Sequence, residues 1–336
     1  MSNGKTSFGL TISNRGVLIR GVNADELVEM AVRAEGTGVL DAIWVGDSIL
    51  SKPRLECIPL LGAIASRTSR VGLGVACMAT IAQRNPMLFG LQWASLDVIS
   101  SGRTLLAACM GYPASQHPAA AKELAVMGIA SKERPGRLEE MIQALRLLWS
   151  EEHATFHGKY YSFDDVNLEP KPVQQPCPIY IAATPRATSI GACGVERALR
   201  RIARYADGWM TNQIHPEMFR DYLARIRGMM VEEGRDPAPF KTVLYYGVCV
   251  RPDRDEAFHE AKSFLDSYYN RDFSRAGVEI WNACGPVEHC VACIQRFIDE
   301  GVDHITVRPV GRNLEEQTSL FVDEVLPALG DARGGG

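Results

Sequence analysis

The side chains best placed to do chemistry in this chain lie at the ends of short apolar segments or directly after them. They are Ser13, Asn14, Asp47, Ser48, Ala76, Cys77, Met78, residues 109–112, Ala183, Thr184, Thr211, Asn212, Arg251 and Arg308. The set offers hydroxyl, thiol and amide groups, but it contains no histidine and no glutamate, which are common in acid–base and metal catalysis. We therefore expect an organic cofactor to supply the reactive group and the protein to bind and orient it.

Motifs of several other enzyme classes are missing from the sequence. It has no G-x-x-x-x-G-K phosphate loop, no H-E-x-x-H zinc motif and no G-x-S-x-G nucleophile turn. One cluster, Cys284, His289, Cys290 and Cys293, has the residue types of a zinc site. Cys290 falls on an apolar helical stripe, so buried structural cysteine is favoured over metal binding, and we expect no metal site.

Eight apolar segments that alternate with helical stretches must position these residues. The predicted strands are 8–13, 42–46, 71–78, 104–108, 179–182, 208–210, 242–250 and 304–307. A proline-rich excursion, at about residues 150–178, interrupts the alternation between the fourth helix and the fifth strand. Short apolar strands joined by helices predict a closed (β/α)8 TIM barrel, as one domain over residues 1–336. An open doubly wound sheet is the alternative, but its glycine fingerprint after the first strand is missing.

Composition and charge exclude several classes of partner. The formal charge is −4 and the pI is about 6.0, so no positive field favours nucleic acid or an anionic membrane. The apolar stretches are shorter than a membrane span, and residues 1–7 lack the apolar segment of a secretory signal. Nine scattered cysteines do not suggest a disulfide framework and indicate a reducing compartment. We expect a cytoplasmic protein.

Short motifs occur in a fixed order over nearly the whole chain. They are AEGTG (34–38), IWVGD (43–47), IASRTSRVGLG (64–74), LDVISSGR (96–103), GKYY (158–161), PKPVQ (170–174), RYADGW (204–209) and GVDH (301–304). Each motif alone is weak. In this order and spacing, the chain resembles the bacterial-luciferase-like family of flavin- and deazaflavin-dependent oxidoreductases.

The resemblance implies a barrel, usually dimeric, that binds reduced FMN or coenzyme F420. It also implies that the insertion covers the mouth, which is the opening of the barrel at the carboxyl ends of the strands. It implies that the cofactor ring rests at the end of the third strand on a non-prolyl cis peptide, which maps to Ala76–Cys77. The alternative is that these are two small residues that simply end a strand. Asn14 and Cys109, at the ends of other strands, are further candidates for cofactor contact.

The resemblance also implies that the cofactor phosphate lies after the fifth strand. There, Ala183, Thr184, Arg186, Thr188 and Ser189 offer backbone amides, hydroxyls and one positive charge. They precede a helix predicted at 196–205. The loop is long and lacks the paired glycines of many relatives, so the hydroxyl that contacts the phosphate is left open.

The chain departs from many relatives after the second strand, where Asp47 and Ser48 stand in place of a histidine. Ser48 is a candidate catalytic residue that can hydrogen bond to a cofactor edge, but it cannot supply a proton as imidazole does. Asp47 is a candidate catalytic carboxylate or a cap of the following loop. His117, in the loop after the fourth strand, is a third candidate catalytic residue, in a region where substrate contacts are expected; the alternative is a plain surface histidine.

The resemblance supports three functions. The leading expectation is a monooxygenase that takes reduced FMN from a separate flavin reductase, forms a flavin hydroperoxide and oxygenates a small organic substrate. The alternative is a coenzyme F420-dependent reductase or dehydrogenase, which transfers hydride and needs no partner reductase. The third is a non-catalytic flavin-binding barrel.

Overall fold

The chain forms a closed barrel of eight parallel strands, as the sequence predicts. The computed structural model describes residues 6–111 and 117–331. The barrel strands are β1 (Ser7–Thr11), β2 (Ala42–Val45), β3 (Gly72–Met78), β4 (Thr104–Ala108), β7 (Ile179–Ala182), β8 (Gly208–Thr211), β9 (Lys241–Val250) and β11 (His304–Pro309). Pairing of β9 with both β8 and β11 closes the ring, which rules out the open sheet.

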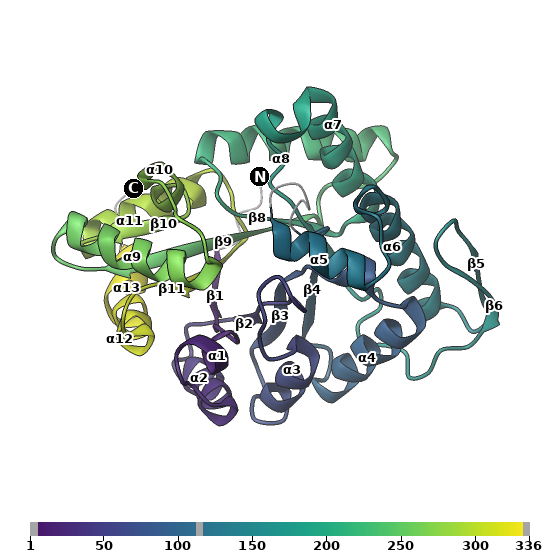
Figure 1. Cartoon of the computed structure of the whole chain (residues 1–336), viewed down its shortest axis with the longest axis horizontal. Helices are drawn as coiled ribbons and strands as arrows, with labels where there is room; N and C mark the ends of the chain where they lie inside the picture. The colour runs from purple at the N-terminus through teal and green to yellow at the C-terminus, as the bar shows by residue number, and fades with distance from the viewer. Residues whose placement is uncertain (1–5, 112–116, 332–336) are drawn as a thin grey trace.

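Helices surround the strands (Figure 1). They are α1 (Gly16–Ile19), α2 (Ala24–Gly36), α3 (Cys57–Ala65), α4 (Pro86–Ile99), α5 (Pro118–Val126), α6 (Arg134–Ser150), α7 (Ala187–Tyr205), α8 (Pro216–Glu232), α9 (Arg254–Tyr269), α10 (Arg275–Glu279), α11 (Val287–Asp299), α12 (Leu314–Leu320) and α13 (Leu326–Asp331). Within the described ranges, no helix is long and apolar enough to cross a membrane.

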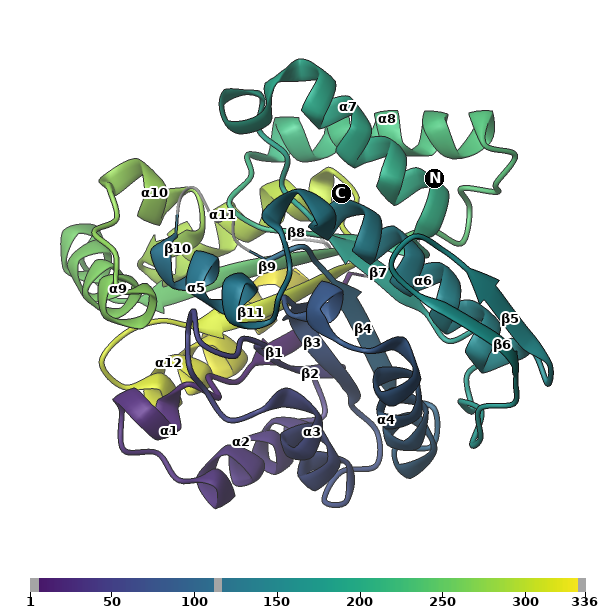
Figure 2. The same ribbon diagram turned by 45° about the vertical axis from the view of Figure 1, so that its right-hand side comes forward.

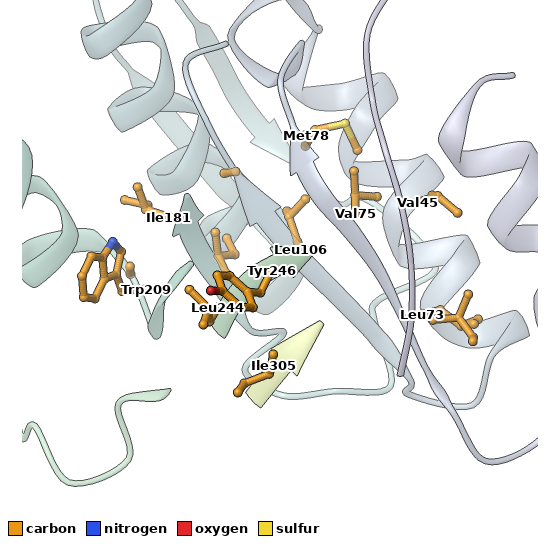
Figure 3. Close-up of a cluster of buried hydrophobic side chains, with 14 of the residues drawn as sticks. Val45, Leu73, Val75, Met78, Leu106, Ile181, Trp209, Leu244, Tyr246 and Ile305 are labelled. Carbon is orange, nitrogen blue, oxygen red and sulfur yellow. The ribbon is translucent and has the colours of Figure 1, made fainter. Parts of the chain in front are cut away.

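Each strand is buried on both faces, by the helices outside and by the other strands' side chains inside the barrel. This burial explains why the strand sequences are continuous apolar runs. Alternate residues of β3, Leu73 and Val75, belong to the large core between barrel and helices (Figure 3), together with Leu106, Ile181, Leu244 and Ile305. The opposite face of β3 carries Gly74, where a Cβ would collide with the ring of Trp44. A small residue on β3 therefore makes room for a tryptophan inside the barrel.

The excursion at 150–178 contains a hairpin of β5 (Ala154–His157) and β6 (Ser162–Val166). The hairpin lies beside α6 on the outside of the barrel (Figure 2), where Glu140 accepts hydrogen bonds from the N–H groups of Lys159 and Tyr160. The hydroxyl of Tyr161 donates a hydrogen bond to the carbonyl of Ala82, in the segment after β3. The hairpin thus lies beside the mouth and does not cover it, contrary to the family pattern.

Two elements that the sequence analysis missed lie at the carboxyl ends of the strands. α5 is held at this end because Glu123 accepts hydrogen bonds from the backbone N–H groups of residues 49–51, in the loop after β2. β10 (Asn282–Gly285) pairs with the last residues of β9, beyond the end of β8. Both are short and lack a clear periodicity. Pro118 at the first position of α5 is a helix-start signal, but a single proline is weak evidence for a helix.

Candidate active site

The Ala76–Cys77 peptide bond at the end of β3 is cis, as predicted. Both side chains are half-buried and pack against the apolar cluster inside the barrel, which includes Trp44 and Ala107. The register between β3 and β4 shifts at this point. The location of the cis bond is confirmed, and its contact with a cofactor ring stays a prediction.

Cys77 is joined by a disulfide to Cys109, the residue that follows β4. Both are predicted cofactor contacts. Their Cα atoms lie 6.0 Å apart although 32 positions separate them in the sequence, because β3 and β4 pair in parallel. This one bridge departs from the fully reduced cysteines that the sequence predicted. The other seven cysteines are free thiols.

Asn14 has a structural position between two loops. Its side-chain N–H groups donate to the carbonyls of Gly46 and Leu55, and its Oδ1 accepts from the N–H of Gly46. The side chain is fully buried. Its polar atoms therefore fasten the loop after β1 to the loop after β2, and the predicted direct contact with a cofactor receives no support.

Asp47 has the capping role that the sequence analysis left open. One carboxylate oxygen accepts hydrogen bonds of 2.7 Å from both the N–H and the hydroxyl of Thr80, and the other lies 3.1 Å from Arg84. The carboxylate is buried. Because both oxygens are engaged, Asp47 holds the segment after β3 in place, and the geometry favours this role over catalysis.

Ser48 also stabilises its own loop. Its hydroxyl accepts a hydrogen bond from the N–H of Lys52 and lies 2.7 Å from the hydroxyl of Ser51. Glu123, which the sequence analysis missed, lies next to this turn. Burial alone would raise the pKa of Glu123, but the N–H groups that it accepts, first that of Ser51, lower the pKa, so the carboxylate is charged at neutral pH.

His117 caps the amino terminus of α5. Its Nδ1 accepts a hydrogen bond from the N–H of Ala120, so the neutral ring carries its proton on Nε2. Burial, followed by the charges of Lys52 and Arg271, lowers the pKa of His117. The ring is neutral at pH 7 and suited to donate a hydrogen bond, but its second nitrogen is used by the cap and does not suit proton abstraction.

Lys52 is a residue of the mouth that the sequence analysis overlooked. Its Nζ lies 4.7 Å from the centre of the Tyr269 ring. Burial, followed by the charges of Arg54 and Arg308, lowers the pKa of Lys52 well below its ordinary value. A lysine with a lowered pKa gives up its proton more readily than an exposed lysine, and its amine can then accept one.

The predicted phosphate segment lies where β7 ends, but its side chains have different roles. The Thr184 hydroxyl is bonded to Thr211 and to the carbonyl of Asn212, so it joins the loops after β7 and β8. Thr188 and Ser189 are exposed in the first turn of α7. This helix begins at Ala187, earlier than predicted, and is interrupted at Gly191, where φ is 67°.

Arg186 lines a cavity of about 520 Å³ between the loop after β8 and the helices α10 and α11. The guanidinium donates to the carbonyl of Gln213. Arg271, Arg296 and His215 line the same cavity, with Glu279 as the acidic residue. Three arginines next to the predicted phosphate segment suit the anionic end of an FMN or F420 molecule.

The chain is similar in sequence to a known protein family and to several of its members. A family model described as luciferase-like monooxygenase matches residues 6–283. The chain is 28% identical to an F420-dependent glucose-6-phosphate dehydrogenase of Amycolatopsis mediterranei, over 90% of this chain and 94% of the relative. It is 31% identical to the enzyme of the same name in Segniliparus rotundus, over 91% of this chain and 94% of the relative.

Solved structures share the fold. An F420-dependent secondary alcohol dehydrogenase, in complex with an F420–acetone adduct, superposes with a TM-score of 0.79 at 20% identity, covering 97% of this chain and 99% of its own. A long-chain alkane monooxygenase superposes with a TM-score of 0.76 at 16% identity, covering 99% of this chain and 92% of its own. These neighbours confirm the barrel architecture.

Proposed function

Because this chain belongs to the luciferase-like monooxygenase family and is an oxidoreductase, we propose that it transfers hydride with coenzyme F420, as a dehydrogenase acting on an alcohol or hemiacetal carbon. The observation that carries the proposal is the set of relatives matched over about nine-tenths of both chains, which are named F420-dependent glucose-6-phosphate dehydrogenases. The leading expectation from the sequence, a reduced-FMN monooxygenase, has support only from distant neighbours such as the alkane monooxygenase.

Two regions of the site would hold the cofactor. The Ala76–Cys77 segment, braced by the disulfide to Cys109, would lie against the ring. Arg186 and Arg271 would bind the anionic end in the neighbouring cavity. When bound, coenzyme F420 supplies a deazaflavin ring that accepts or donates hydride.

The protein itself must handle the proton of the substrate hydroxyl. We assign this role to Lys52, because its half-buried amine lies at the mouth and its pKa is lowered by burial and by Arg54. His117 does not suit the role, since its Nδ1 caps α5. In this assignment, Lys52 Nζ takes the place of the imidazole that many relatives carry after the second strand.

The proposal is tested with purified protein and both cofactors. We expect F420 to bind at least about tenfold more tightly than FMN, a difference of ~1.4 kcal/mol. Oxidised F420 should then lose its visible absorbance in the presence of glucose-6-phosphate or of a simple secondary alcohol. Tighter binding of FMN, together with oxygen uptake from reduced FMN and an organic substrate, would restore the monooxygenase expectation.

A further inference from the structure

Arg308 is a buried cation with one edge of its guanidinium unused. The residue is 1% exposed and lies near the end of β11. Its Nη1 donates to the hydroxyls of Tyr269 (2.7 Å) and Tyr245 (3.2 Å). Its Nε and Nη2 are buried and have no hydrogen-bond partner among the described residues. These two nitrogens form the edge that pairs with two oxygens of a carboxylate or phosphate.

Two more arginines lie, together with Arg308, around the ring of Tyr268. The Cζ atoms of Arg15 and Arg54 are each 5.8 Å from the centre of the Tyr268 ring, and that of Arg308 is 6.0 Å away. Gly46 makes this approach possible, because a Cβ at Gly46 would collide with the guanidinium of Arg54. The loops after β1 and β2 thus bring two charges to the one on β11.

Lys52 adds a fourth basic group beside Arg308. Its Nζ lies 4.7 Å from the centre of the Tyr269 ring, and the Cζ of Arg308 lies 5.5 Å from it. Arg15, Lys52, Arg54 and Arg308 are called the cationic cluster below. Aromatic faces stabilise the guanidinium charges of the three arginines by cation–π attraction, but they do not fill a bidentate hydrogen-bonding edge.

The carboxylate of Asp47 acts on Arg54 through space, but no carboxylate in the described part of the chain pairs directly with the three arginines of this cluster. Over residues 6–111 and 117–331, no ion pair joins Arg15, Arg54 or Arg308 to an acidic side chain. The acidic residues at the mouth serve other partners: Asp47 pairs with Arg84, and Glu123 accepts from backbone N–H groups. A buried charge without a counter-charge is costly, so the cluster calls for an anion.

Further unpaired polar atoms lie on the same side of the mouth. The Ser13 hydroxyl, just past β1, and the Nε of Arg15 are buried and lack partners in the described part of the chain. β1 pairs directly with β11, which carries Arg308. Ser13 and Arg15, just after β1, and Arg308 on the paired strand β11 therefore each keep a hydrogen-bonding atom unused among the described residues, and all can donate to an oxyanion.

We propose that Arg308, with Arg15 and Ser13, binds the oxyanion of an anionic substrate, a carboxylate or a phosphate ester, at the β1–β11 side of the mouth. As a statement about the substrate, this inference rests on the proposed function. It assigns the anion of the substrate to the cationic cluster and the anion of the cofactor to the Arg186 cavity.

The test uses the full-length, cofactor-free protein and two probes, inorganic phosphate and acetate, with chloride at matched ionic strength as the reference. Thermal melting and tryptophan fluorescence report binding, since Trp281 lies 4.4 Å from the Cζ of Arg308. The variants are Arg308→Gln and, as a matched control, Arg251→Gln, whose guanidinium is already paired with Glu260 and Glu316. Tyr269→Phe keeps the charge of Arg308 and serves if Arg308→Gln does not fold.

We expect saturable binding of phosphate, acetate or both, with a half-saturating concentration about tenfold higher in Arg308→Gln and unchanged in Arg251→Gln. Tyr269→Phe should weaken binding less. Preference for phosphate would identify a phosphate ester, and preference for acetate a carboxylate. Equal binding by the wild type and Arg308→Gln, or no saturable binding in the wild type, would overturn the proposal.

A parallel titration with F420 separates the two proposals. If Arg308→Gln weakens F420 binding about as much as anion binding, the anion belongs to the cofactor, and the substrate site is disproved. If the wild type fails to bind F420 but shows the Arg308-dependent anion response, the anion site stands and the proposed function fails.

Discussion

Trp44 Nε1 donates a hydrogen bond of 3.1 Å to Nε2 of His304 inside the barrel. The two residues lie on β2 and β11, the strands on either side of β1. On the other side of the imidazole, Nδ1 lies 2.7 Å from the hydroxyl of Ser7. The neutral ring therefore carries its proton on Nδ1, and protonation of Nε2 would break the bond to Trp44.

This relationship predicts a loss of stability at mildly acidic pH. Burial lowers the pKa of His304 from its usual 6.5 to about 4, so the unfolded chain binds more protons than the folded protein between these values. Stability is therefore fully present above pH ~6.5 and falls as the pH drops toward ~4. A shift of this size corresponds to roughly 3 kcal/mol, and partial solvent access reduces the expected loss to about 2 kcal/mol.

Urea unfolding at several pH values measures this loss. His304→Gln, whose amide oxygen can still accept from Trp44, should show a flatter pH dependence over the same window. His259, on the exposed face of α9, gives the control variant His259→Gln. Identical pH dependence in the wild type and His304→Gln would contradict the assignment.

Substitution of Asp47 should lower the stability of the protein and not only its catalytic rate. Asp47→Ala leaves Arg84 without one carboxylate and leaves the N–H of buried Thr80 unpaired, at an expected cost of about 3 kcal/mol. Asp255→Ala, which removes an exposed pair with Arg275, should cost less than ~1 kcal/mol. Equal melting temperatures for Asp47→Ala and the wild type would argue for a catalytic role instead.

The disulfide between Cys77 and Cys109 predicts a specific thiol count. Unfolded, non-reduced protein should give seven reactive thiols, and reduced protein nine. Cys77→Ser should show one more thiol than the non-reduced wild type, because Cys109 loses its partner. Nine thiols without reduction would show that the bridge does not form in solution.

Arg186→Ala should raise the dissociation constant for the cofactor about tenfold, because it removes one charge-assisted hydrogen bond from the anionic end. The melting temperature of the cofactor-free protein should change little. Arg197→Ala, at an exposed position of α7, is the matched control. Thr184→Ala is less informative, because its hydroxyl also joins two loops. Unchanged cofactor affinity in Arg186→Ala would place the anionic end elsewhere.

Lys52→Met should lower kcat about a hundredfold while leaving the dissociation constant for F420 unchanged. The wild-type rate should fall as the pH drops through the lowered pKa of Lys52, because only the neutral amine accepts a proton. Lys241→Met, which removes a charge paired with Asp303, is the control. A wild-type rate in Lys52→Met would exclude the amine as the proton acceptor.

Local patterns in the sequence were sufficient to predict most strands and helices of the barrel. The bounds predicted for β4 and β7 match the structure, because apolar runs are local signals that act over a few residues. The family motifs were sufficient to locate the cis bond at Ala76–Cys77. The start of α7 was misplaced because Gly191 interrupts it and hides the first turn.

The roles of the site residues depended on contacts between distant segments. Asn14 and Asp47 stand at strand ends, as predicted, but their partners, Gly46 and Thr80, come from neighbouring loops that the closed barrel brings together. The disulfide of Cys77 with Cys109 has the same origin.

The sequence by itself determined a (β/α)8 barrel of the luciferase-like family, because periodicity and motifs are local properties. Only the tertiary structure showed that Lys52 and Arg308 lie around one tyrosine ring and that two nitrogens of Arg308 have no hydrogen-bond partner among the described residues. Burial and charge proximity depend on which strands and loops become neighbours, and 256 positions in the chain separate these two residues.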